Sequence, residues 1–190
     1  FFDANGDDAI NYGGIGAVIG HEASHGFDDE GSQFDGDGNN KNWWTKEDRA
    51  KFDERAGKLV AQFNEYAPIK DHPDLHVNGK LTLGENIADL GGLNVAYDAL
   101  QEALKKNPQE AQEKIDGYTQ DQRFFLNWAR VWRSNVREKQ AMLYLNVDPH
   151  APASLRAIGA PSNMEAFASA FQCKPDAKMI RAADKQVKIW

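Results

Sequence analysis

Three of the four residues at positions 13–16 are glycines, and they stand at the start of a helix that the sequence predicts over residues 13–27. Each glycine destabilises an isolated helix by about 1 kcal/mol relative to alanine. Because glycine has no Cβ atom, such a run allows a second stretch of backbone to come very close. The run is also unusual for a helix that merely lies on the surface. We therefore expect this helix to pack tightly against another part of the chain.

The composition is that of an ordinary folded domain. The chain has 190 residues, of which 41% are hydrophobic and 27% are charged, so it can bury a substantial core and is not disordered. Lys and Arg number 22 and Asp and Glu 29, which gives a net charge of -7. An acidic chain without a basic cluster is a poor ligand for nucleic acid or for an anionic membrane surface. No apolar run approaches the ~18 residues of a membrane span, so we expect neither a nucleic-acid partner nor a membrane segment in this chain.

Helical periodicity recurs along most of the sequence. Thr45 is placed to cap a second helix that ends before Pro68. Residues 83–106 carry apolar side chains three and four positions apart, which is typical of a helix with a buried face. Shorter or later helices are predicted at 120–134, 138–145 and 163–171, and the prolines at 149, 152 and 161 indicate a loop. Since few segments alternate like strands, the predicted fold class is mainly α.

The clearest indication of a catalytic or metal-binding site is a pair of histidines four residues apart. His21, Glu22 and His25 form an H-E-x-x-H motif within the first predicted helix. Residues four apart share one face of a helix, so both imidazoles can bind one zinc ion. Glu22 lies beside them, where a carboxylate can take a proton from a water molecule. The alternative is a chance match on an amphipathic helix, which the glycine run before the motif makes less attractive.

A pair of carboxylates downstream is the best source of a third ligand. Catalytic zinc takes three protein ligands and keeps one position open. Glu85 and Asp89 share a face of the predicted helix at 83–106, among apolar residues. One of them could bind the metal while the other orients a histidine; the alternative is a solvated acidic face. Asp28, three residues after His25, could turn back to hold that imidazole, or could be an ordinary surface aspartate.

At these residues the chain resembles the C-terminal catalytic part of the neprilysin-like zinc metalloendopeptidases. The similar blocks occur in order over nearly the whole chain. They lie at 11–16, 18–22, 25–29, 43–45, 83–89, 91–92, 124–126, 131–132, 156, 158–159, 163, 170–171, 173 and 190. The resemblance implies the helical, C-terminal portion of a thermolysin-like zinc peptidase catalytic domain over residues 1–190.

The resemblance also assigns roles around a metal centre. It implies one zinc ion per chain, bound by His21, His25 and Glu85. The catalytic groups that it implies are Glu22 as general base, His150 as a hydrogen-bond donor to the transition state, and Asp89. Asp28 and Asp89 become the carboxylate partners of the two histidines.

Substrate binding is implied at five further positions. Arg156 matches a substrate-binding arginine, and the pocket for the side chain just after the scissile bond matches Phe1, Val18, Val131 and Trp132. Without the resemblance, His150 would be interpreted as an ordinary loop histidine and Arg156 as a surface charge. The four pocket residues would be interpreted as ordinary residues of the hydrophobic core.

The function implied is hydrolysis of peptide bonds in oligopeptides by a metal-activated water. The alternative is a peptide-binding module that binds zinc but is catalytically silent; a helical interaction domain without metal fits the glycines and paired carboxylates poorly. The family's N-terminal region, including its substrate-anchoring segment, is expected upstream of Phe1, so this chain by itself could be inactive. The resemblance favours an extracytoplasmic or cell-surface location, and the single cysteine, Cys173, suggests a bacterial source.

Overall fold

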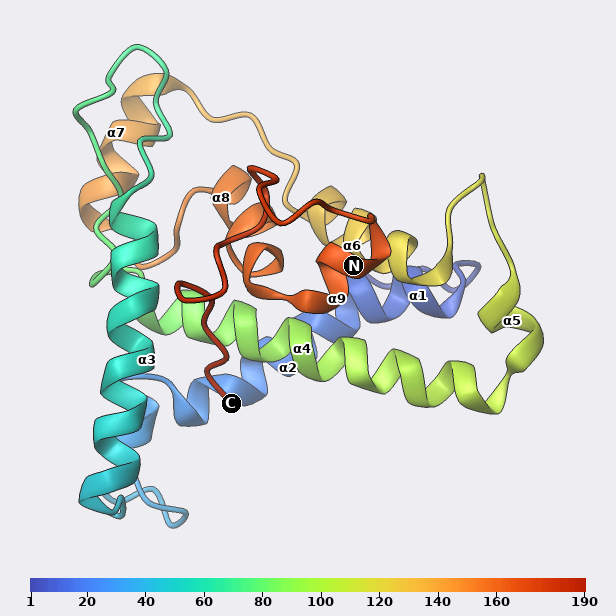
Figure 1. The fold of residues 1–190 in the computed structure, drawn as a ribbon. Coiled ribbons are helices and arrows are strands. Elements are labelled where there is room, and N and C mark those ends of the chain that lie inside the picture. Colours follow the sequence, from blue (N-terminus) through green and yellow to red (C-terminus); the bar gives the residue numbers. More distant parts are fainter.

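The computed structural model describes residues 1–190 and consists of helices joined by loops (Figure 1). Its only β-type pairings are two isolated bridges, Phe34 with Asn40 and Ile115 with Tyr118. The mainly α fold class predicted from the sequence is therefore confirmed. None of the helices combines the length and the apolar character that crossing a membrane requires.

The glycine run lies in a continuous helical segment that changes its winding three times. Helix α1 (Asp8–Asn11) leads into a π-helical turn over Tyr12–Gly16, then into α2 (Ala17–Ser24) and a 3₁₀ turn over His25–Phe27. The segment thus begins five residues earlier than predicted, where the Asp7 side chain accepts a hydrogen bond from the Ile10 nitrogen. A π turn inside a helix is rare and often occurs next to a functional site.

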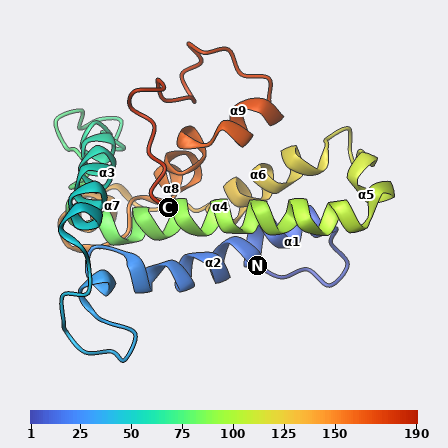
Figure 2. The ribbon, with the colours of Figure 1, turned by 60° about the horizontal axis from the view of Figure 1, so that its bottom comes forward.

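The close backbone approach expected of the glycine run is present at Gly13, and a second close approach lies at Gly92. A Cβ atom on Gly13 would lie 2.2 Å from the carbonyl oxygen of Phe124, in α6 (Gln120–Val131). A Cβ atom on Gly92, in α4 (Leu83–Lys106), would lie 2.2 Å from the backbone nitrogen of His21. Figure 2 shows α2 running alongside α4. The Gly92 contact excludes any side chain where α4 crosses α2, and the Gly13 contact does the same where the π turn meets α6.

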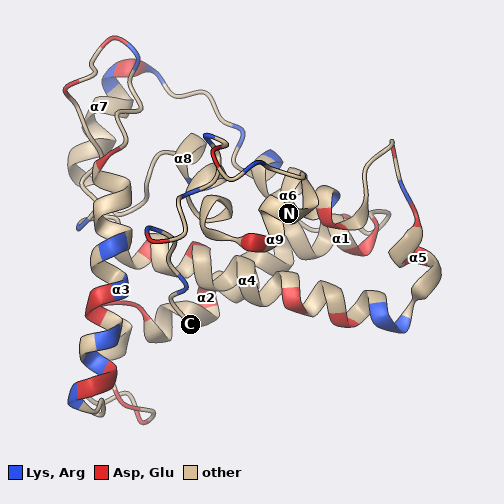
Figure 3. Cartoon of the chain, viewed as in Figure 1, with Lys and Arg blue, Asp and Glu red and all other residues tan.

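Three further helices contact α4: α3 (Lys46–Asn64), α5 (Pro108–Gln112) and α8 (Ala153–Gly159). Helix α3 is capped by Thr45, whose hydroxyl accepts a hydrogen bond from the Asp48 nitrogen at 3.1 Å. Figure 3 shows acidic and basic residues interspersed along α3. Helices α3, α4 and α6 contribute most of the residues of one buried apolar core of 23 residues. The two other helices are α7 (Glu138–Val147) and α9 (Glu165–Ala170).

The prediction of a loop between Pro149 and Pro161 is wrong in part, because α8 occupies Ala153–Gly159. Pro152 is the N-cap of α8 and Pro161 follows its end, so neither proline interrupts a helical hydrogen bond. Seven residues are too few for a recognisable apolar period. Burial of Leu155 and Arg156 supports the helix instead.

Candidate metal centre

Helices α2 and α4 bring two histidines and one glutamate to a single point. His21 lies in the second turn of α2, His25 begins the following 3₁₀ turn, and Glu85 lies in the first turn of α4. The two imidazole Nε2 atoms are 3.1 Å apart. Glu85 Oε2 lies 3.2 Å from His21 Nε2, and Glu85 Oε1 lies 3.6 Å from His25 Nε2. One ligand atom from each residue is within 4.8 Å of the others.

The other nitrogen of each imidazole faces a buried carboxylate. Asp89 Oδ1 is 2.9 Å from His21 Nδ1, and Asp28 Oδ2 is 2.8 Å from His25 Nδ1. Asp28 also accepts hydrogen bonds from the backbone nitrogens of Glu30 and Gly31, which fix its position. With each Nδ1–H donated to a carboxylate, both Nε2 lone pairs are free to bind a metal ion. The structure therefore places Asp89 beside His21 and Glu85 at the centre, a choice that the sequence pattern had left open.

The donor set fits a zinc ion. Glu85 Oε2 is buried and faces the same point as the imidazole nitrogens, with His21 Nε2 and His150 Nε2 each 3.2 Å away. Two imidazole nitrogens and a carboxylate oxygen match the His₂Glu ligand set of zinc peptidases, which leaves one coordination position open. Both histidines are far from Glu85 in the sequence, so α4 has to pack on α2 before the site exists.

The electrostatics of the centre favour a positive charge. Burial acts to lower the pKa of His21, but its hydrogen bonds to Asp89 and Glu85 outweigh burial and raise the pKa of His21 to about 9. Burial acts to raise the pKa of Glu85, yet the hydrogen bond from His21 and the charges of His150 and Arg156 hold that pKa below its usual value. Both shifts have one physical cause, which is the close pairing of carboxylates with cationic groups in a buried cluster.

Arg156 is buried beneath this cluster. Its Nε and Nη2 atoms donate to Asp89 Oδ2 and Oδ1 at 2.8 and 2.7 Å. Its guanidinium carbon lies 3.9 Å from the centre of the Trp132 ring, a cation–π contact. A guanidinium has five N–H donors, so Arg156 keeps others for a ligand. Neither contact was predicted from the sequence. For the contact with Asp89 the reason is distance along the chain, because Arg156 and Asp89 are 67 residues apart and no local pattern joins them.

Of the other residues expected at the site, His150 lies beside Glu85 and Glu22 is exposed. His150 Nε2 is 3.2 Å from Glu85 Oε2, and its Nδ1 faces Asp148 Oδ1 at 2.9 Å. Asp148 is not among the residues predicted from the sequence, although the Asp-x-His spacing of 148 and 150 was a usable signal. Glu22 follows His21 directly and its side chain is exposed to solvent.

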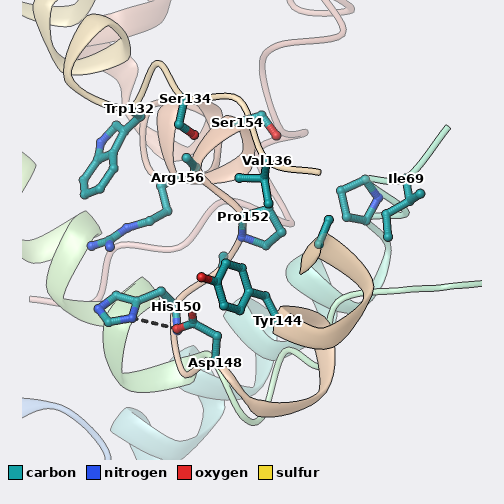
Figure 4. Close-up of a pocket in the computed structure, with 14 residues that line it drawn as sticks. Ile69, Trp132, Ser134, Val136, Tyr144, Asp148, His150, Pro152, Ser154 and Arg156 are labelled. Atoms are coloured by element: carbon teal, nitrogen blue, oxygen red, sulfur yellow. Dashed lines mark hydrogen bonds and ion pairs between the residues drawn. The ribbon is translucent and has the colours of Figure 1, made fainter. Parts of the chain in front are cut away.

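A cavity of about 390 Å³ opens beside His150 (Figure 4). Of the four residues expected to form a side-chain pocket, Trp132 lines this cavity, whereas Phe1, Val18 and Val131 lie outside it. Val18 and Val131 are half-buried, and Phe1 is 64% exposed at the N-terminus. The structure thus places Trp132, Arg156 and His150 around one cavity but does not gather all four predicted pocket residues there.

Comparison with known proteins agrees with this geometry. The family model described as "Peptidase family M13" matches residues 1–187. The chain belongs to peptidase family M13. Neprilysin-11 of Caenorhabditis elegans is 44% identical over 191 residues, which cover 100% of this chain and 22% of that protein. Human neprilysin is 40% identical over 194 residues, which cover 100% of this chain and 25% of that protein.

A solved M13 structure has the same fold. The crystal structure of a Mycobacterium tuberculosis zinc metalloprotease in complex with an inhibitor superposes with a TM-score of 0.95 and 47% identity. The match covers 100% of this chain and 29% of that one. The resemblance to neprilysin-like peptidases that the sequence predicts is confirmed. This chain spans less than a third of the length of the relatives that it matches.

Proposed function

We propose that this chain is the C-terminal, zinc-binding part of the catalytic domain of a zinc-dependent endopeptidase that hydrolyses peptide bonds in oligopeptides. The observation that carries the proposal is the convergence of His21, His25 and Glu85 ligand atoms within 4.8 Å. Membership of family M13 supports the same activity. One zinc ion per chain would be held by these three residues.

The reaction needs an acid–base group next to the metal. The chemistry that zinc supplies when bound is polarisation of the peptide carbonyl and activation of a water molecule. Glu22 takes the proton from the attacking water and later delivers it to the leaving amine. Its exposed position directly after His21 supports this role, because the side chain is free of other partners and open to a substrate.

Two further groups act on the substrate. His150 donates a hydrogen bond from Nε2 to the oxygen on which negative charge develops, and Asp148 holds the ring in place. Arg156 binds a peptide carbonyl through the N–H groups that Asp89 leaves free. Asp28 and Asp89 keep the two histidines oriented toward the metal. Phe1, Val18, Val131 and Trp132 contribute to a pocket for the side chain just after the scissile bond.

The partner of this chain is the rest of the same protein. Because the chain spans 22% of Neprilysin-11, a larger N-terminal region would complete the substrate cleft. The extracytoplasmic or cell-surface location and the bacterial source that the sequence suggests stay predictions.

The test combines metal analysis with a peptide-cleavage assay. The wild-type chain should contain one zinc ion, and Glu22→Gln should retain that zinc while turnover falls by roughly 10²-fold or more. The assay is run with and without the N-terminal region supplied as a separate polypeptide. Zinc loss in Glu22→Gln would show that Glu22 is a ligand and not the base. Zinc binding without any cleavage in the completed protein would favour the silent peptide-binding module instead.

A further inference from the structure

The π turn that precedes the metal-binding helix lies directly against α6. Asn127 of α6 donates a hydrogen bond of 2.7 Å from Nδ2 to the backbone oxygen of Ile10, in α1. The same nitrogen would lie only 2.8 Å from a Cβ atom on Gly14, within the π turn. Asn127 is 7% exposed, so its amide is almost enclosed at this contact. One side chain of α6 thus contacts both the helix before the π turn and the turn itself.

The π turn sets an angle between two parts of the molecule. It holds one residue more than an α-helical turn: the Tyr12 nitrogen donates to the oxygen of Asp8, four residues back, whereas the Ala17 nitrogen donates to the oxygen of Tyr12, five residues back. Each residue rotates an α-helix by about 100°, so the extra residue turns α2 by about that angle relative to α1. The turn therefore fixes how the histidines of α2, which face α4, are oriented relative to α1, which is bonded to α6.

The end of α6 carries groups that the proposed reaction uses. Trp132 directly follows α6, and its ring centre lies 3.9 Å from the guanidinium carbon of Arg156. Trp128, within α6, donates from Nε1 to the backbone oxygen of Arg156 at 3.2 Å. Figure 4 shows Trp132 and Arg156 at the cavity, and we call these two residues the substrate wall. Helix α6 therefore contacts the π turn along its length and the substrate wall at its end.

We propose that Asn127 is a positioning residue for the reaction: by holding the π turn, it fixes how Glu22 and the metal centre face the substrate wall. The inference rests on the proposed peptidase function where it concerns turnover, whereas the spacing itself can be measured without cleavage. The zinc ligands are brought together elsewhere, because His21 meets Glu85 where α2 crosses α4 at Gly92. Loss of the Asn127 contact should therefore reduce turnover while zinc affinity stays unchanged.

A second contact between α6 and α1 provides a control for a general loss of stability. Arg123, one helical turn before Asn127, donates from Nε and Nη2 to the side chain of Asp7, the N-cap of α1. This largely buried ion pair is made to the start of α1 and not to the π turn. Arg123→Met should lower the melting temperature, because it leaves a largely buried carboxylate without its partner. It should leave the spacing between the metal centre and the substrate wall unchanged.

The π turn also offers a matched pair of glycine substitutions. The Cβ atom of Gly14→Ala would lie 2.8 Å from both Asn127 Nδ2 and the backbone oxygen of Phe1, so it displaces Asn127 from the opposite side of the contact. Gly16→Ala adds the same methyl group to the same turn, 3.4 Å from the backbone oxygen of Asn11, which is an ordinary contact. Asn127→Asp keeps the shape of the side chain but replaces its N–H donor by an acceptor.

Two inhibitors measure the spacing in the zinc-loaded protein completed by its N-terminal region. Acetohydroxamate binds at the zinc ion alone, whereas a hydroxamate joined to a leucyl-alanine dipeptide reaches from the zinc ion to the substrate wall. Competition with a chelator measures zinc affinity, thermal unfolding measures stability, and a peptide-cleavage assay gives kcat and KM.

Asn127→Asp and Gly14→Ala should each lower kcat by about 10–100-fold, because a misplacement of about 1 Å is enough for such a loss. Both should weaken the dipeptide hydroxamate by about tenfold, with zinc affinity and acetohydroxamate binding unchanged. Arg123→Met and Gly16→Ala should match the parent in kcat and in both inhibitor affinities.

The comparison of the two inhibitors decides the inference. It is overturned if folded Asn127→Asp and Gly14→Ala bind both inhibitors as the parent does, if either loses zinc, or if Arg123→Met weakens the dipeptide hydroxamate equally. If Asn127→Asp does not fold, the comparison of Gly14→Ala with Gly16→Ala still gives the answer. A parent that binds both inhibitors but never cleaves peptides refutes the proposed function alone. A parent that cleaves peptides while the substitutions at Asn127 and Gly14 change neither inhibitor refutes this inference alone.

Discussion

Substitution of Gly92 by alanine should destroy the metal centre without touching any ligand. The Cβ atom that Gly92→Ala adds would lie 2.2 Å from the backbone nitrogen of His21 and 2.7 Å from the carbonyl carbon of Gly20. Both contacts are with backbone, so no flexible side chain can move aside. Since non-bonded heavy atoms ordinarily approach to about 3.5 Å, α4 has to move away from α2 by roughly 1.3 Å.

A displacement of that size is large for a zinc site. His21 and His25 move with α2, whereas Glu85 and Asp89 move with α4. Metal–ligand distances in a working site lie within about 0.2 Å of their ideal values. We therefore expect zinc affinity to fall by about 100-fold or more, and overpacking at the crossing to cost about 1–3 kcal/mol of stability.

The chain offers a matched control for this substitution. Gly57 is an exposed residue within α3, and a Cβ atom on it would meet nothing within 4 Å. Gly57→Ala should leave zinc affinity unchanged and stabilise the chain by about 0.5–1 kcal/mol, because it removes a glycine from a helix interior. Competition with a chelator measures zinc affinity, and thermal unfolding measures stability. Wild-type zinc affinity in a folded Gly92→Ala chain would refute the argument that this crossing sets the ligand spacing.

Other perturbations test the individual groups. Glu85→Ala should reduce bound zinc well below one ion per chain in metal analysis, and an unchanged zinc content would remove Glu85 from the site. Asp28→Ala should weaken zinc binding by about 10–100-fold in the same chelator assay. Asp89→Ala should weaken it more, because it also leaves the buried guanidinium of Arg156 without its partner; equal effects of the two aspartates would contradict this. The chain by itself should bind zinc yet cleave peptides slowly, since an endopeptidase must also hold its substrate extended in a closed cleft, and full activity of the 190 residues alone in a peptide assay would disprove it.

The helices that carry the metal ligands could be predicted from sequence because their patterns are local. The helix at 83–106 was predicted with the bounds that the structure shows. Its apolar residues recur over several turns, and a spacing of four places two side chains on one face of any helix. The helix predicted at 120–134 ends earlier, at Val131, and α8 was missed, because short helices and helix ends depend on packing more than on periodicity.

The sequence by itself determined that His21 and His25 share a face and that Glu85 and Asp89 share another. It left open which carboxylate faces the metal, since both lie one helical turn apart on the same surface. Only the packing of α4 on α2 at Gly92 decided that Glu85 lies between the imidazoles and Asp89 behind His21. The same packing buried Arg156 on Asp89, although the two are 67 residues apart. Local patterns report which side chains share a surface, whereas the distance between two surfaces is set by the atoms at the helix crossing.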